Sequence, residues 1–129
     1  MTLCPCASGQ PYAACCARLH AGAEPAATAE ALMRSRYSAY VLGLEAYLLA
    51  TWHRSTRPAA LHLADEVGTK WQGLAVKRHQ ALDETHAVVE FVARYRVAGR
   101  GHRLHEISNF VREDGCWFYV DGNLNGGAA

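Results

Sequence analysis

The stretch His86-Ala87-Val88-Val89-Glu90-Phe91-Val92-Ala93-Arg94-Tyr95-Arg96-Val97 alternates between two kinds of side chain. Every second residue from Ala87 to Val97 is apolar, whereas the residues between them mix Glu90 and two arginines with valines. A period of two residues is typical of a β-strand that buries one face. The stretch therefore predicts a strand with its apolar face on the core.

Turn residues and further alternating segments lie on both sides of this strand. The sequence Ala98-Gly99-Arg100-Gly101 predicts a hairpin that returns as a strand over 102–113, and Asp114-Gly115 predicts a second tight turn before a last strand over 116–121. Another strand is expected over 71–82. Strands joined by short turns predict an antiparallel meander.

Before residue 70 the apolar residues recur with the period of a helix. Thr28 is a good N-cap and Gly43 offers a C-cap, so the segment between them is expected to be one helix. Shorter helices are expected over 44–52 and 59–66. Helices followed by a meander predict an α+β fold, with the helices packed on one face of a curved sheet.

Composition favours one globular domain with a small appendage. The 129 residues include 13 basic and 12 acidic side chains, for a net charge of +1, and half of the chain is hydrophobic. This balance gives no reason to expect nucleic-acid binding or a membrane anchor. There is no apolar run near the roughly 20 residues that span a bilayer, and no secretory signal at Met1–Pro5, so we expect a cytoplasmic protein.

Four of the five cysteines lie within 13 residues at the N-terminus. They form the pattern Cys4-x-Cys6, eight residues, then Cys15-Cys16. Four thiolates from two short turns can close a tetrahedral zinc site, with Gly9 turning the chain back and Ser8 donating a hydrogen bond to a thiolate. All four ligands would come from protein, which is typical of a structural metal.

Disulfides or reactive thiols are the alternative for this cluster. Neighbouring Cys15 and Cys16 are awkward disulfide partners, and a reducing cytosol favours metal ligation. Cys116 stands alone on the last predicted strand and is expected to be a core or half-buried residue.

The motifs of the chain resemble a known family. The run Cys4-Pro5-Cys6-Ala7-Ser8-Gly9-Gln10-Pro11-Tyr12, with Cys15-Cys16, resembles the SEC-C zinc motif, and the rest resembles the NTF2-like middle domain of the YchJ (UPF0225) family. The stretches that carry the second resemblance are Thr28–Tyr40, Thr51–His53, Trp71–Leu74, Val89–Tyr95, His105–Phe110 and Gly115–Gly122.

The resemblance implies a domain plan and a set of metal ligands. Together with the break at Gly22 and Pro25 and the lack of pattern at the C-terminal end, it divides the chain into a zinc knuckle (1–22), a connector (23–27), an NTF2-like domain (28–122) and a flexible tail (123–129). It implies zinc ligation by Cys4, Cys6, Cys15 and Cys16 and assigns no reaction. The chain departs from the motif in two ways: Ala7 replaces the usual glycine, and Gln10-Pro11 replace basic residues that often follow.

By analogy, an NTF2-like cone often holds a cavity with an acid–base group. Glu90, His105 and Glu106 are the candidates for that group, and the period of two lets only one of His105 and Glu106 face the cone. The candidates for the walls are Tyr37, Tyr40, Trp52, His53, Trp71, Trp117 and Tyr119.

Structural roles are also open for these residues. The tyrosines at helical spacing are typical of a core, Glu90 has Arg94 or Arg36 as a candidate partner, and Trp52-His53 is placed to seal a helix end. Basic residues from Arg94 to Arg103 suggest either contact with RNA or a solvated hairpin edge.

Two hypotheses of function follow. The first is a non-enzymatic interaction module, in which the zinc knuckle docks a protein partner and the NTF2-like domain dimerises or holds a ligand. The second is a small-molecule enzyme that uses Glu90 or His105 in the cone as general acid or base. RNA binding is a weaker third hypothesis.

Overall fold

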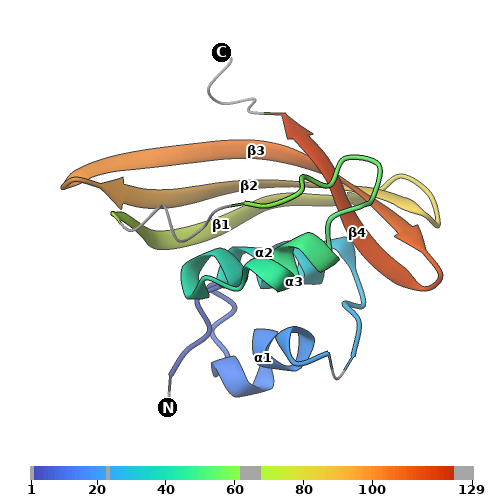
Figure 1. The fold of residues 1–129 in the computed structure, drawn as a ribbon, viewed down its shortest axis with the longest axis horizontal. Coiled ribbons are helices and arrows are strands. Elements are labelled where there is room, and N and C mark those ends of the chain that lie inside the picture. Colours follow the sequence, from blue (N-terminus) through green and yellow to red (C-terminus); the bar gives the residue numbers. More distant parts are fainter. Residues whose placement is uncertain (1, 23, 62–67, 124–129) are drawn as a thin grey trace.

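The computed structural model describes residues 2–22, 24–61 and 68–123, and it has the expected α+β architecture (Figure 1). One four-stranded antiparallel sheet has the order β1-β2-β3-β4. Its strands are β1 (Thr69–Ala81), β2 (His86–Val97), β3 (Arg100–Glu113) and β4 (Cys116–Asn123). The predicted meander is confirmed, and β2 has the predicted bounds.

Two-residue turns connect the last three strands. Ala98 and Gly99 have φ of 52° and 79°, and Asp114 and Gly115 have φ of 52° and 80°. Positive φ at both central residues is the geometry that suits the twist of a hairpin. Because the first turn needs only Ala98 and Gly99, β3 begins at Arg100, two residues before the predicted start.

The other strand ends differ slightly from the prediction. Strand β1 spans Thr69–Ala81 instead of 71–82. Strand β4 continues to Asn123, which pairs with Ile107. Residue 123, which was expected to begin the tail, therefore belongs to the strand. The rest of that tail lies outside the described residues.

Helix α2 (Ala29–Leu42) matches the predicted helix and its two caps. The Thr28 hydroxyl accepts a hydrogen bond from the Ala31 amide at 3.0 Å, and Gly43 ends the helix with φ of 74°. Helix α3 (Glu45–Ala50) lies within the predicted 44–52. The helix predicted over 59–66 is not formed at 59–61, and its remaining residues lie outside the described part of the chain.

The core lies between α2 and one face of the sheet. Figure 1 shows α2 and α3 together on this face. Leu32, Met33 and Tyr37 of α2 pack against the predicted apolar face of β2 and against Phe110 of β3. No helix among the described residues is long and apolar enough to span a membrane.

The N-terminal segment packs against α2 and has short elements of its own. These are a 3-10 turn, η1 (Tyr12–Ala14), and helix α1 (Cys16–His20). The His20 ring accepts a hydrogen bond from the Tyr12 hydroxyl at Nδ1 (2.6 Å) and donates from Nε2 to the Ser35 carbonyl (2.8 Å). Arg34 donates to the Cys6 carbonyl at 2.7 Å. The cysteine segment is thus hydrogen-bonded to α2.

Candidate functional site

The four N-terminal cysteines meet in one cluster. Their Sγ atoms all lie within 4.8 Å of one another, with 3.7 Å between Cys6 and Cys15 and 3.9 Å between Cys15 and Cys16. Cys4, Cys6 and Cys16 are buried, and all five cysteines of the chain are free thiols. The structure therefore brings together four ligands that could bind one metal ion.

The loop between the two cysteine pairs turns through two residues with positive φ. Gly9 has φ of 83°, as its predicted role requires, and the Cys4 amide donates to the Gln10 carbonyl at 2.8 Å across the turn. Ala7 has φ of 66°, a conformation that suits glycine better than alanine. This tight loop sets Cys4 and Cys6 opposite Cys15 and Cys16.

Two serine hydroxyls contact the sulfur atoms. Ser8 Oγ lies 3.3 Å from Cys15 Sγ, which agrees with its expected role. Ser38 Oγ, from the middle of α2, donates to Cys16 Sγ at 3.4 Å and lies 3.5 Å from Cys4 Sγ. Sequence reasoning missed Ser38, because nothing in the local pattern of a helix marks contact with a cluster 22 residues away.

The thiols differ strongly in acidity. Hydrogen bonding from Cys16, with further bonds from Ser8 and Cys4, lowers the pKa of Cys6 to about 4, although burial opposes this. The pKa of Cys16 is raised, first by its hydrogen bond to Cys6 and then by burial. Cys6 is thus the first of this pair to ionise, and its thiolate would be the first of the two to bind a metal ion.

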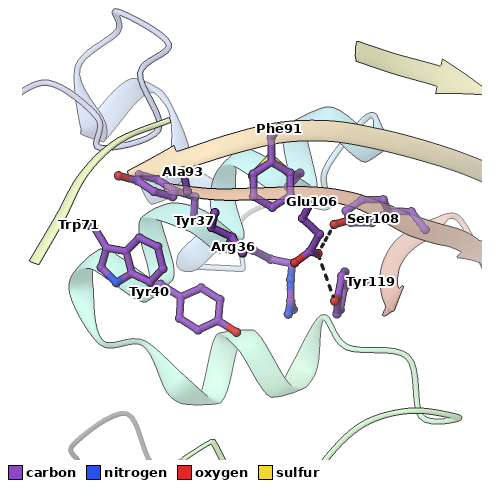
Figure 2. A pocket seen from close by; sticks show the side chains of 12 residues that line it. Arg36, Tyr37, Tyr40, Trp71, Phe91, Ala93, Glu106, Ser108 and Tyr119 are labelled. Carbon is purple, nitrogen blue, oxygen red and sulfur yellow. Dashed lines mark hydrogen bonds between the residues drawn. The ribbon is translucent and has the colours of Figure 1, made fainter. Parts of the chain in front are cut away.

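A second feature is a pocket of about 270 Å³ between α2 and the sheet (Figure 2). Most of its walls are apolar or aromatic, and two charged side chains, Arg36 and Glu106, also line it. The full lining is Met33, Arg36, Tyr37, Tyr40, Trp71, Phe91, Ala93, Leu104, Glu106, Ser108, Phe110 and Tyr119.

Glu106 supplies the carboxylate of this pocket. Its Oε2 accepts hydrogen bonds from Ser108 Oγ at 2.5 Å and from the Tyr119 hydroxyl at 3.4 Å (Figure 2). Burial first, and then the negative charge of Glu106, raise the pKa of Tyr119. Tyr119 therefore stays protonated and remains a donor to the carboxylate.

Arg36 is the buried cation of the pocket, only 6% exposed. Its Nη1 donates to the Leu48 carbonyl at 2.8 Å and to Thr51 Oγ1 at 2.7 Å. The guanidinium carbon lies 5.1 Å from the Trp52 ring centroid and 4.6 Å from that of Tyr119. Burial lowers the pKa of Arg36, while neighbouring tyrosines and Glu106 oppose that shift.

Four of the predicted wall residues line the pocket and three do not. Those that line it are Tyr37, Tyr40, Trp71 and Tyr119, and those outside it are Trp52, His53 and Trp117. The Trp52 ring packs edge-on against Tyr119 at 5.0 Å. His53 points to Glu113, with 2.9 Å between Nε2 and Oε2.

The sequence did not identify Arg36 as a residue of the pocket. A charged residue within a helix is usually exposed on the surface, so nothing in the pattern of α2 marked Arg36 as buried.

Glu90 or His105 was expected to be the acid–base group of the cavity, but neither residue lines the pocket. Both lie on the face of the sheet opposite the pocket, where His105 Nε2 is 2.7 Å from Glu90 Oε2. Glu90 also pairs with Arg78 at 3.6 Å, instead of with Arg94 or Arg36. Since neighbouring strand residues point to opposite faces, the same register that turns His105 outward turns Glu106 into the pocket.

The basic residues near the β2–β3 hairpin are solvent-exposed. Arg94, Arg96, Arg100 and Arg103 are all exposed, and His102 stacks on Tyr95 with 5.1 Å between ring centroids. Exposed charged side chains in such a row are typical of a solvated hairpin edge.

Comparison with known proteins matches both parts of the chain. The model of the SEC-C motif matches residues 2–18, and the model of the YchJ middle NTF2-like domain matches residues 28–122. A UPF0225 protein of Chromobacterium violaceum is 63% identical over 123 residues, which cover 92% of this chain and 90% of that protein. A UPF0225 protein of Bordetella pertussis is 54% identical over 123 residues, with 94% and 92% covered.

Two solved structures share the fold along most of the chain. The solution structure of a SEC-C motif containing protein from Rhodopseudomonas palustris has a TM-score of 0.86 and 35% identity, covering 93% of this chain and 96% of that one. The crystal structure of a SEC-C motif containing protein from Psychrobacter arcticus has a TM-score of 0.78 and 31% identity, with 92% and 80% covered.

Proposed function

This chain belongs to the YchJ (UPF0225) family, and on that premise we propose that it is a zinc-binding, non-enzymatic interaction module. In this proposal Cys4, Cys6, Cys15 and Cys16 hold a structural zinc ion. The zinc knuckle docks a protein partner, and the NTF2-like domain holds a small ligand or dimerises. The free thiols suit a reducing compartment, which supports the cytoplasm as its location.

The spacing of the four sulfur atoms carries the proposal for zinc. Four sulfurs at about 2.3 Å from a central zinc ion stand about 3.8 Å apart at the corners of a tetrahedron. Two of the six distances between Sγ atoms, 3.7 Å and 3.9 Å, fit this geometry, and the others are no longer than 4.8 Å. With every ligand position taken by protein, the ion would supply folding free energy to the knuckle.

The exposed end of the knuckle supports the proposal of a docking surface. Leu3 is 63% exposed, and the loop 7–10 beside it is exposed as well. Leu3 is thus an apolar side chain on the accessible face of the knuckle, where a protein partner could pack against it. The pocket between α2 and the sheet supports the proposal of a bound ligand.

Native mass spectrometry of the full chain tests the metal and the dimer in one spectrum. We expect one zinc ion per chain, lost in Cys6→Ser and Cys16→Ser and kept in Cys116→Ser, which removes the remote thiol. Metal-free chains whose masses are lighter by the hydrogens lost to disulfides would refute the zinc site.

Point variants at exposed apolar residues test the docking surface. Leu3→Ser should lose a protein that the unaltered chain captures from a lysate and that rebinds in purified form. Leu82→Ser is the matched control, because Leu82 is 57% exposed on the distant β1–β2 turn. Equal binding by both variants would place the contact elsewhere.

An enzyme that uses the pocket is the second candidate. Glu106 favours it, because this carboxylate lies among apolar walls beside a tyrosine hydroxyl, where a general acid or base would stand. A turnover screen of the unaltered chain and Glu106→Gln tests it. Turnover that survives the substitution would remove Glu106 as the acid–base group.

A further inference from the structure

The polar groups of the pocket are arranged around one carboxylate oxygen. Both hydrogen bonds that the lining residues donate to Glu106 end on Oε2, from Ser108 and Tyr119. Figure 2 shows this carboxylate between those two donors on one side and Arg36 on the other. Oε1 takes part in neither of these two bonds, which leaves it as the carboxylate oxygen available to a ligand.

The two charges of the pocket offset each other. Arg36 and Glu106 line the same cavity, and the negative charge of Glu106 favours the charged form of Arg36. A cationic ligand would meet Arg36, and an anionic ligand would meet Glu106. Because the two charges offset each other, a charged ligand meets no net opposite charge that would compensate for its desolvation, so this arrangement selects against ligands with a net charge.

Two of the five N–H donors of Arg36 are engaged by the protein. Nη1 bonds to Leu48 and Thr51, and two aromatic rings lie near the guanidinium. Arg36 therefore holds α2 against α3 and against Thr51, the residue that follows α3. It leaves Glu106 as the charged group that can accept a hydrogen bond from a ligand.

Aromatic rings form the rest of the recognition surface. Tyr37 and Trp71 meet edge to face with 5.8 Å between centroids, and Tyr40 lies 5.9 Å from Trp71. Tyr40 and Trp71 also line a neighbouring surface depression, so they stand where the pocket opens to the outside. A volume of about 270 Å³ is just below the range of pockets that hold drug-sized molecules.

We propose that this pocket binds a small, planar, uncharged molecule that donates an N–H or O–H hydrogen bond to Glu106. The planar body lies against the aromatic rings, and the donor group reaches the carboxylate. This inference rests on one clause of the proposed function, that the NTF2-like domain holds a ligand, and it names the class of that ligand.

Three probes of nearly equal size separate the classes of ligand. Benzamide is an uncharged donor, benzylamine is a cation and benzoate is an anion. Each is titrated into the zinc-loaded full chain, and binding is followed by the NMR signal of the Trp71 indole N–H. We expect benzamide to bind most tightly of the three.

Two matched substitutions test the role of Glu106. Glu106→Gln replaces a charged acceptor by a neutral one and should weaken benzamide binding about tenfold. Glu90→Gln makes the same change on the outer face of the sheet and should leave benzamide affinity unchanged. Thermal unfolding of both variants checks that the domain stays folded.

Three results would overturn the inference. They are tighter binding of benzylamine or benzoate, an affinity for benzamide that Glu106→Gln leaves unchanged, and a Trp71 signal that none of the probes shifts. Zinc content is measured on the same samples. A failed titration of zinc-loaded protein therefore counts against the pocket and leaves the metal site standing.

Discussion

Gly122 of β4 lies directly against the side chain of Glu106 on β3. A Cβ atom at position 122 would stand 2.8 Å from Glu106 Cγ and closer still to the carboxylate. Gly122 pairs with Ser108, which is also a donor to that carboxylate. The absence of a side chain at position 122 therefore allows Glu106 to reach both Ser108 and Tyr119.

Gly122→Ala should displace the Glu106 carboxylate while leaving the fold intact. The atoms nearest to the new methyl group are the carboxyl group and Cγ of Glu106, so this side chain must rotate about χ1 and give up its hydrogen bonds to Ser108 and Tyr119. We expect benzamide affinity to fall by about as much as in Glu106→Gln, roughly tenfold. Gly101→Ala is the control, because nothing lies within 4 Å of a Cβ there. Unchanged affinity in Gly122→Ala would show that the carboxylate position does not matter.

Ser38→Ala should weaken zinc binding without removing a ligand. The Ser38 hydroxyl contacts two of the four sulfur atoms, and loss of such supporting contacts typically weakens metal affinity about tenfold or more. Competition with a chromophoric chelator measures this affinity. Ser55→Ala, at an exposed serine bonded to His53, should bind zinc like the unaltered chain. If Ser38→Ala and Ser55→Ala bound zinc with equal affinity, the contact that Ser38 makes from α2 would not contribute to metal binding.

Arg36→Lys should destabilise the domain although the charge is kept. Lysine cannot reproduce the paired bonds to Leu48 and Thr51, or the planar contact with the rings of Trp52 and Tyr119. We expect the free energy of unfolding to fall by about 2–3 kcal/mol. Urea titration measures it, with Arg94→Lys on the exposed face of β2 as the control. If Arg36→Lys lowered the free energy of unfolding by no more than Arg94→Lys does, a structural role for Arg36 would be contradicted.

Asp83 makes the stability of the β1–β2 turn depend on pH. The Thr85 amide, and then His86, hold the pKa of Asp83 at about 2. Because this value lies below that of an unfolded aspartate, about 3.9, the ionised group stabilises the fold above about pH 4, and the contribution is lost as the pH falls toward 2.

The advantage of the unaltered chain over Asp83→Asn should therefore be largest near neutral pH and should shrink in acid. Urea midpoints between pH 2 and pH 7 measure it. Glu84→Gln, one residue further along the same exposed turn, is the control. A difference between Asp83→Asn and the unaltered chain that stays constant with pH would contradict the assignment.

Most of the fold follows from local patterns in the sequence. The alternation from His86 to Val97 has a period that only a strand satisfies, and Thr28 and Gly43 carry cap chemistry that needs no tertiary contact. The helix predicted over 59–66 rested on a short apolar pattern without such caps. At Ala59–Leu61, the part of it that the structure describes, no helix is formed.

The pocket was harder to predict than the cysteine cluster. Cysteines close in sequence must meet in space, whereas the pocket joins Arg36 of α2 to Glu106 of β3 across 70 residues. Alternation showed that His105 and Glu106 face opposite ways, but only the register against β2 shows which of them faces α2. Ser38 and Gly122 act through contacts with distant residues, so no local pattern marks them.

Ala7→Gly should stabilise the cysteine loop. Ala7 has φ of 66°, a left-handed conformation that costs an L-residue with a side chain roughly 1–2 kcal/mol and costs glycine little. Glycine also gains more freedom in the unfolded chain, which offsets part of this benefit. We therefore expect the free energy of unfolding of the zinc-loaded protein to rise by about 0.5–1 kcal/mol. Ala13→Gly, in the 3-10 turn Tyr12–Ala14 of the same segment, should lower it instead, since positive φ is not required there. Equal losses in both variants, measured by urea titration, would show that the backbone at Ala7 is not strained.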